Sequence, residues 1–252
     1  MKARIKDSGI IFKTSPYSES SLILKAFLRE RGLISIIAKG IRKKAEADLL
    51  NPLCDYEFTL YEPQEGGLYL LCEFSLARQY DLSRKVESWT AAECAIELYS
   101  RLIIPSDENP QYHELLHQFL DYLLSVDKNA ILIWWRFLLR VFTLLGTPFR
   151  PDHCAVCHDS GRKIIAYDKG AAILICPDCF EPSSEQVRYE LLSSQGSTIL
   201  QLLPRIGDHV STIGLEGECV RQINRIFADF YLSHYNRPLK LRSLEVLEQF
   251  YR

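Results

Sequence analysis

Residues 8–38 read SGIIFKTSPYSESSLILKAFLRERGLISIIA, and this stretch decides the fold of the N-terminal third. It contains three runs rich in β-branched and aromatic residues, at 8–13, 20–28 and 32–38, with turn signals at Ser15-Pro16 and Arg31-Gly32 between them. Further runs follow at 54–61 and 68–74, and the first of these alternates apolar and polar residues with a period of two. Five short strands predict a small β-barrel. We expect a five-stranded Greek-key barrel of the OB type, although an SH3-like barrel fits the same pattern.

The period of the apolar residues changes to that of a helix from about residue 81. Two amphipathic helices are expected on either side of PSDENP, residues 105–110, which is expected to be a loop. A third helix, about 129–145, is apolar nearly all round and ends at Gly146, so we expect it at the centre of a helical domain. Further helices are expected near 193–203, 217–235 and 243–250. The predicted fold class is therefore α+β, with an OB-type barrel domain at 1–80 and a helical domain at 81–252.

Four cysteines form two C-x2-C pairs separated by eighteen residues: Cys154, Cys157, Cys176 and Cys179. This spacing is typical of a four-cysteine zinc site, and a hairpin of strands near 164–167 and 171–175 would bring the two pairs together. Four thiolates complete a tetrahedral shell, so we expect a structural Zn²⁺ ion that activates no water. Iron in a rubredoxin-like site and a redox dithiol are the alternatives. The zinc module, about 151–182, is expected to be inserted within the helical domain.

The composition is that of a globular protein kept in a reducing compartment. The chain has 252 residues, of which 47% are hydrophobic and 25% charged, enough for a sizeable core. Its first residues lack the pattern of a signal peptide, and the longest apolar stretch, 130–145, is too short for a membrane span and contains Arg136 and Arg140. We therefore expect a cytoplasmic protein with no membrane partner.

Basic residues gather near the N-terminus although the net charge is only −2. Up to Lys44 the chain has eleven Lys and Arg against three acids, whereas residues 45–80 have seven acids against Arg78 alone. The run Lys39-Gly40-Ile41-Arg42-Lys43-Lys44 follows the third expected strand, in what should be an exposed loop. Such cations can follow the phosphates of DNA, and the alternative is a solvated loop without a specific role. Tyr17 lies in a turn where its ring could stack on a base.

Two pairs of arginines, Arg136 with Arg140 and Arg221 with Arg225, each share a helix face because four residues separate them. Each pair is either an ordinary ion-paired face or a docking surface for an acidic peptide or DNA. The sequence has no Gly-rich phosphate loop, no His-Glu-x-x-His and no nucleophile elbow. We therefore expect a protein that is not an enzyme.

Three segments together resemble the RecO family of bacterial recombination and repair mediators. They are GIIFKTSPYSESSLILKAFLRERGLISIIAKGIRK at 9–43, LLRVFTLLGTPFRPDHCAVCH at 138–158 and HYNRPLKLRSLEVLEQF at 234–250. In this order they are far more specific than the cysteines alone, and the resemblance spans nearly the whole chain.

The resemblance implies a protein that binds single- and double-stranded DNA, anneals complementary strands and helps load recombinase on strands coated by single-strand DNA-binding protein. It implies two protein partners, RecR and the acidic C-terminal tail of the single-strand DNA-binding protein, and a place on the bacterial nucleoid. Carried over to this chain, the DNA surface falls on Lys39, Arg42, Lys43 and Lys44, with Arg29 and Arg31 beside them. A zinc-stabilised adaptor that binds only proteins, and a nuclease with dispersed catalytic residues, are the competing hypotheses.

Overall fold

The computed structural model describes residues 3–63, 66–181 and 188–252. These residues form two compact units. The first contains the chain up to Arg84 together with Ala95–Leu124, and the second contains Lys85–Cys94 together with Ser125–Arg252.

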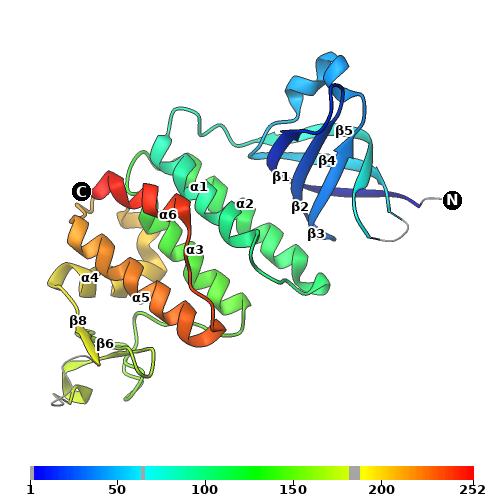
Figure 1. Cartoon of the computed structure of the whole chain (residues 1–252). Helices are drawn as coiled ribbons and strands as arrows, with labels where there is room; N and C mark the ends of the chain where they lie inside the picture. Colours follow the sequence, from blue (N-terminus) through cyan, green and yellow to red (C-terminus); the bar gives the residue numbers. More distant parts are fainter. Residues whose placement is uncertain (1–2, 64–65, 182–187) are drawn as a thin grey trace. The chain divides into compact units, whose positions relative to one another are not determined.

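Five strands of the first unit form a closed barrel in the order β1-β2-β3-β5-β4 (Figure 1). β3 and β5 pair in parallel, and every other neighbouring pair is antiparallel. The first half of β1 pairs with β4 and its second half with β2, which closes the barrel. The five predicted strands are confirmed, although β1 and β5 are longer than expected. Their bounds are β1 Arg4–Pro16, β2 Leu22–Leu28, β3 Gly32–Ala38, β4 Cys54–Tyr61 and β5 Tyr69–Gln79.

The barrel interior follows the period-two pattern of its strands. Tyr56, Phe58 and Leu60 of β4 are fully or almost fully buried, whereas Glu57 between them is exposed. Gly9 allows β1 and β2 to approach closely, since a Cβ atom there would lie 2.3 Å from the carbonyl oxygen of Phe27. The alternation therefore decides which side chains fill the core.

Helix α2 (Asn109–Ser125) belongs largely to the same unit as the barrel. Arg78 at the end of β5 forms an ion pair with Asp121 on this helix, and Asn109 Nδ2 donates a hydrogen bond of 3.3 Å to the carbonyl oxygen of Glu30. The prediction of a loop over 105–110 was wrong for its second half. Ser106–Glu108 form a 3-10 turn and α2 already begins at Asn109, because proline is tolerated in the first turn of a helix.

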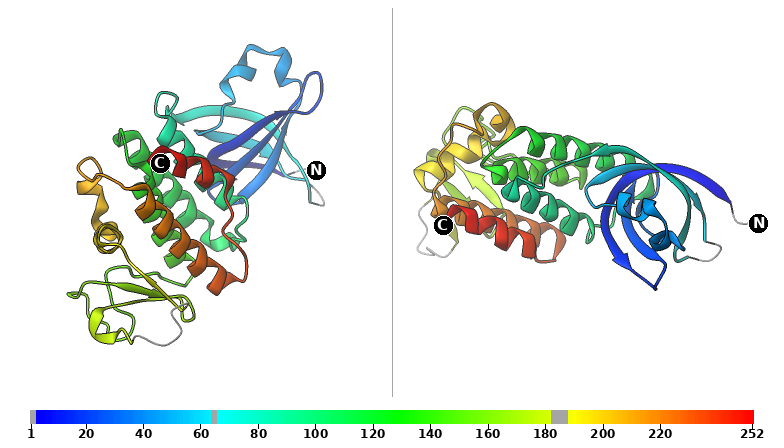
Figure 2. Two further views of the ribbon diagram at one scale, coloured as in Figure 1. Left: turned by 60° about the vertical axis from the view of Figure 1, so that its left-hand side comes forward. Right: turned by 90° about the horizontal axis from the view of Figure 1, so that it is seen from above.

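Helix α3 (Ala130–Leu144) is the centre of the second unit, as its apolar sequence predicted. Trp134 and Trp135 are fully buried, and the Trp135 indole donates a hydrogen bond of 2.8 Å to Asn224. Figures 1 and 2 show α3 and α5 side by side, with α6 next to them. No helix within the described ranges is long and apolar enough to cross a bilayer. The other helices of this unit are α1 Val86–Tyr99 (shared with the first unit), α4 Ser194–Leu202, η5 Leu203–His209, α5 Gly217–Tyr235, α6 Arg242–Leu247 and η6 Glu248–Tyr251.

A small three-stranded sheet, in the order β7-β6-β8, lies between α3 and α4 in the chain. The hairpin of β6 (Ala166–Asp168) and β7 (Ile173–Ile175) was predicted, but β8 (Tyr189–Leu191) was not. The turn Asp168-Lys169-Gly170 between two apolar runs marks the hairpin, whereas no short turn joins β8 to its partner β6. The buried carboxylate of Asp168 holds β8 in place, because it pairs with Arg188 through contacts of 2.6 and 2.9 Å.

Candidate metal centre and nucleic-acid interface

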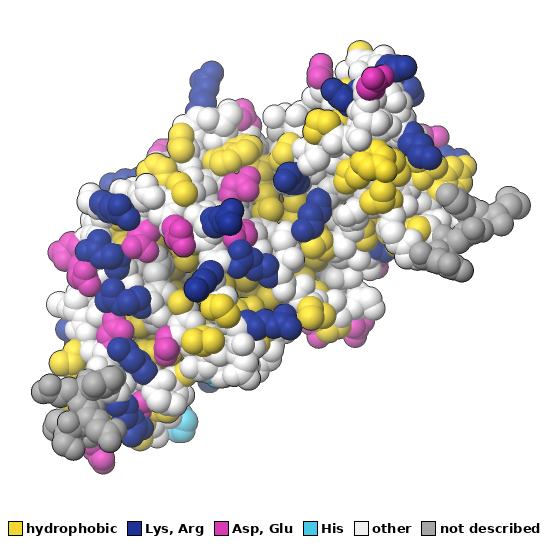
Figure 3. Space-filling view, in the orientation of Figure 1, with side chains coloured by type: hydrophobic (Ala, Val, Ile, Leu, Met, Phe, Trp, Pro, Cys, Tyr) yellow, Lys and Arg dark blue, Asp and Glu magenta, His cyan; other side chains and the backbone are white. Residues whose placement is uncertain are grey.

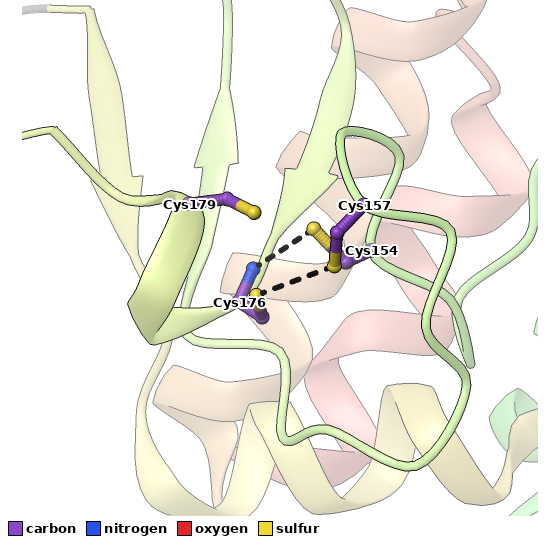
Figure 4. Close-up of side chains that lie close together, drawn as sticks. All are labelled: Cys154, Cys157, Cys176 and Cys179. Atoms are coloured by element: carbon purple, nitrogen blue, oxygen red, sulfur yellow. Dashed lines mark hydrogen bonds between the residues drawn. The ribbon is translucent and has the colours of Figure 1, made fainter.

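The four predicted cysteine ligands converge at one point of the small module (Figure 4). Their Sγ atoms all lie within 4.8 Å of one another, and those of Cys157 and Cys176 are 3.8 Å apart. A tetrahedral site with Zn–S bonds of about 2.3 Å requires neighbouring sulfurs roughly 3.8 Å apart. The cluster is therefore compatible with a metal site of this kind.

Each cysteine pair lies in a tight turn next to the hairpin. Residues after Cys154 are tied to β7 by a hydrogen bond of 2.9 Å from Ala155 N to the carbonyl oxygen of Leu174. Cys176 follows β7 directly, and the 3-10 turn η4 (Pro177–Cys179) brings Cys179 back toward it. The two-residue gaps thus point both sulfurs of a pair toward the same position.

The surroundings of Cys154 favour a thiolate. Burial raises the pKa of this thiol, but hydrogen bonds from the backbone N–H groups of Cys157, Cys176 and Val156 outweigh burial and bring the pKa to about 6. The N–H of Cys176 lies 3.4 Å from the sulfur. Backbone N–H groups directed at sulfur are what a metal-bound thiolate needs, because they satisfy its remaining lone pairs. Four protein ligands leave no open position for a reacting water.

The basic run of 39–44 lies in an exposed turn after β3, as expected. Gly40 has φ of +70°, which lets the chain turn sharply into η1 (Ile41–Lys43). Ile41 is buried and anchors the turn, whereas the side chains of Lys39, Lys43 and Lys44 are exposed. In the part of the chain that the structure describes, these three lysines form no ion pair. We call residues 39–44 the basic loop.

Arg42 differs from the lysines of the basic loop because it has a structural contact. Its guanidinium donates a hydrogen bond of 2.6 Å to the carbonyl oxygen of Ser18, and its backbone N–H bonds Ser20. These bonds connect the basic loop to the β1–β2 turn that carries Tyr17, whose exposed fraction is 61%. The turn expected at Tyr17 is present, and its ring is exposed as stacking on a base requires.

Arg29 and Arg31 lie in very different surroundings. Arg31 pairs with Asp7 at 3.1 Å, and the Asp7 side chain is only 1% exposed. Arg31 also lies 3.6 Å from Glu62. Arg29 is exposed, and the one ion pair it forms with a described residue, at 3.6 Å to Glu30, is loose. Arg31 thus neutralises a buried carboxylate, and Arg29 remains available to a ligand.

A groove of about 350 Å³ lies beside the basic loop. Lys39 and Lys44 contribute to its wall, and Leu71, Phe74 and Leu76 of β5 contribute apolar surface. Phe12 and Phe27 are buried in the core of the same unit and offer no surface for stacking. Phe74, which the sequence analysis did not consider, is half-buried in this groove next to cations.

Acidic residues lie immediately beyond the basic loop. Glu46 and Asp48 are exposed in the following turn, η2 (Ala45–Leu49), and Glu46 also lines the groove. Figure 3 shows basic and acidic side chains close together over the η1–η2 segment. The positive surface is therefore narrow, and ends where η2 begins.

The two arginine pairs expected on helices lie in different surroundings. Arg221 and Arg225 on α5 form ion pairs with Glu218 and Glu190, the nearest at 2.8 Å, and are an ordinary ion-paired face. Arg136 and Arg140 on α3 line a groove of about 530 Å³ together with Arg150. Leu139 and Phe149 add apolar surface to the same groove. This combination of guanidinium groups and apolar surface suits an acidic peptide.

Comparison with known proteins gives matches over nearly the whole chain. The family model described as "Recombination protein O N terminal" matches residues 1–80, and "Recombination protein O C terminal" matches residues 84–243. The chain is 24% identical to "DNA repair protein RecO" of Halalkalibacterium halodurans, a match that covers 94% of this chain and 92% of the relative. It is 26% identical to the protein of the same name from Clostridium perfringens, with 98% of both chains covered.

Proposed function

Because this chain belongs to the Recombination protein O family, whose role is DNA repair and recombination, we propose that it is a non-catalytic mediator. It binds single- and double-stranded DNA, anneals complementary strands and helps load recombinase on strands coated by single-strand DNA-binding protein. Binding alone can do this work, because pairing of two strands held close together requires no covalent step.

The DNA surface in this proposal is the basic loop with Arg29, on a domain formed by residues 1–80. The observation that carries it is the exposure of Lys39, Lys43 and Lys44 beside a groove that contains Phe74. Cations that follow phosphates supply affinity without sequence preference, and aromatic rings stack on unpaired bases. The strand order and the parallel β3–β5 pair are consistent with a barrel of the OB type, a fold that binds oligonucleotides.

Residues 81–252 form the partner-binding domain in this proposal. The groove lined by Arg136, Arg140 and Arg150 would accept the acidic C-terminal tail of the single-strand DNA-binding protein, with its apolar residues against Leu139 and Phe149. RecR is the second protein partner. The protein would act in the cytoplasm at the bacterial nucleoid.

The metal of the module at about 151–182 is zinc in this proposal, and its role is structural. The donor set of four thiolates suits Zn²⁺, and bound zinc would supply folding free energy to a sheet of three short strands. The turns that carry the two cysteine pairs position the sulfurs, and four thiolates would leave no open coordination position. Elemental analysis of the purified protein checks the assignment, and bound Fe³⁺ would be visible as colour.

Strand annealing is the test of the proposed function. Two complementary fluorescent oligonucleotides are mixed with the protein, with and without the cognate single-strand DNA-binding protein. We expect the protein to accelerate annealing in both cases. On coated strands this acceleration should disappear when the acidic tail of the single-strand DNA-binding protein is deleted. No acceleration at low and moderate salt would overturn the proposal, and shortened labelled strands in the presence of Mg²⁺ would point to a nuclease instead.

A second hypothesis is a zinc-stabilised adaptor that binds proteins and not DNA. The proximity of Glu46 and Asp48 to the basic loop favours it, because these carboxylates repel phosphates. A gel shift with short DNA separates the two hypotheses, since an adaptor of this kind shifts no DNA at moderate salt.

A further inference from the structure

Three potential metal ligands meet in the first unit, away from the four cysteines. They are Asp55 near the start of β4 and His113 and His117 on α2, and their ligand atoms all lie within 4.8 Å of one another. The two histidines share a helix face because four residues separate them. Their Nε2 atoms are 3.2 Å apart, and Nε2 of His117 is 3.8 Å from a carboxylate oxygen of Asp55.

The cluster is largely buried, but it is not closed to solvent. His113 is 7% exposed, and the side chains of Asp55 and His117 are 13% and 18% exposed. The second carboxylate oxygen, Oδ1 of Asp55, is buried and has no hydrogen-bond partner among the described residues. A buried carboxylate without a full set of partners is costly, and a cation is one way to offset that cost.

We propose that Asp55, His113 and His117 bind a divalent first-row transition-metal ion such as Zn²⁺. In a tetrahedral site with Zn–N bonds of 2.0–2.1 Å, two nitrogen ligands lie about 3.3–3.4 Å apart, close to the separation of the two Nε2 atoms. The carboxylate must move only slightly closer to complete the set. Imidazole and carboxylate together suit zinc, nickel, cobalt and iron, whereas four thiolates form a softer site.

The surrounding residues orient the ligands as a metal site requires. Nδ1 of His117 forms a hydrogen bond with the Tyr80 hydroxyl, and in the tautomer in which Nδ1–H donates to the hydroxyl oxygen, Nε2 has its lone pair available for the ion. Arg78 lies 4.7 Å above the ring of Tyr80, and its charge is balanced by Asp121.

A bound ion would cross-link the barrel to α2, since one ligand comes from β4 and two come from the helix. Three protein ligands leave a fourth position for water or another small ligand. The competing interpretation is a hydrogen-bonded chain from Tyr80 through His117 to His113 that binds no ion. The proposal does not depend on the proposed function in DNA repair.

The test counts bound metal in the full-length protein. Metal-free protein is titrated with Co²⁺, whose thiolate complexes give an intense near-ultraviolet charge-transfer band that nitrogen and oxygen ligands do not give. We expect one equivalent of Co²⁺ to add visible d–d absorption without the thiolate charge-transfer band. Asp55→Asn and His117→Gln should abolish that equivalent and leave the thiolate band unchanged. His209→Gln, at an exposed histidine outside the cluster, is the matched control and should keep both.

Equal Co²⁺ stoichiometry and spectra in the parent protein, Asp55→Asn and His117→Gln would overturn the proposal. If these variants lose their fold, Tyr80→Phe supplies the decisive measurement, because it keeps all three ligands. Loss of a partner that orients a ligand weakens metal affinity by roughly 10–100-fold. Affinity unchanged in Tyr80→Phe would exclude the site, and metal-dependent slowing of amide exchange in α2 would support it.

Discussion

The four-cysteine cluster and the basic loop are both short motifs that the sequence makes visible, yet their physical situations are opposite. The sulfurs converge on one point and are held by a hairpin and by backbone N–H groups. The lysines of the basic loop extend into solvent and form no ion pair among the described residues. One motif brings all of its side chains to one point, whereas the other presents charges that no described residue pairs with. Exposed basic side chains without ion pairs are thus the better indicator of a surface that binds another macromolecule.

The largest effect is expected for Cys176→Ser, which tests the four-cysteine cluster. It should remove bound metal and lower the free energy of unfolding of the module by several kcal/mol, because binding of structural zinc is worth roughly 10–16 kcal/mol in small peptides. Metal content and urea denaturation measure both effects. Cys72→Ser, at a half-buried cysteine outside the cluster, is the control and should keep the metal. Full metal content in Cys176→Ser would show that this thiol is not a ligand.

A second variant tests the basic loop. It replaces four basic residues by Ala: Lys39, Arg42, Lys43 and Lys44. Affinity for DNA should fall by roughly 10–100-fold and the salt dependence should flatten by up to about 3–4 in log–log slope, since each phosphate contact contributes about 0.9. Fluorescence anisotropy at several salt concentrations measures both.

A control variant removes four basic side chains that already form ion pairs: Arg162, Lys169, Arg221 and Arg225. This control lowers the net charge as much as the first variant does. It should keep most of the affinity for DNA and most of the salt dependence, because these side chains already form ion pairs. Equal losses in the two variants would mean that overall charge, and not the basic loop, attracts DNA.

Arg31 lies near the basic loop, but we expect it to stabilise the fold and not to bind DNA. Arg31→Ala should lower the free energy of unfolding by about 2 kcal/mol, because it leaves the buried carboxylate of Asp7 without its counter-ion. Arg29→Ala should change stability by less than about 0.5 kcal/mol, as expected for an exposed, loose pair. Chemical denaturation compares them directly. Equal stability of the two variants would contradict the structural role of Arg31.

The smallest expected effect concerns Asp168, which holds β8 in the metal module. Its hydrogen bonds with Arg188, more than any other cause, lower the pKa of the Asp168 carboxyl. A carboxyl with a lowered pKa in the folded state stabilises the fold above the pKa of the unfolded chain, about 3.9, and this stabilisation is lost as pH falls through the folded-state value.

Asp168→Asn should therefore cost about 1 kcal/mol at pH 7, and the difference from the parent protein should shrink as the solution is acidified below about pH 4. Urea denaturation at a series of pH values measures this. A difference that stays constant with pH would show that packing, and not the charge of Asp168, matters.

Much of the fold could be predicted because its signals are local. Alternation in 54–61 reflects side chains that point to opposite faces of a strand, and the apolar sequence of α3 reflects burial on all sides. The small sheet was predicted only in part. β8 is joined to its partner β6 by no short turn, and an ion pair between Asp168 and Arg188, which are twenty positions apart, adds to the strand pairing.

The sequence by itself determined the five strands of the barrel, the central helix and the two cysteine pairs, because backbone periodicity and two-residue spacings act over a few residues. Only the tertiary structure decided that Arg31 neutralises Asp7 while Arg29 stays exposed, and that Asp55 meets His113 and His117. These contacts join residues up to 62 positions apart. Their existence depends on how strands and helices pack, which no local pattern records.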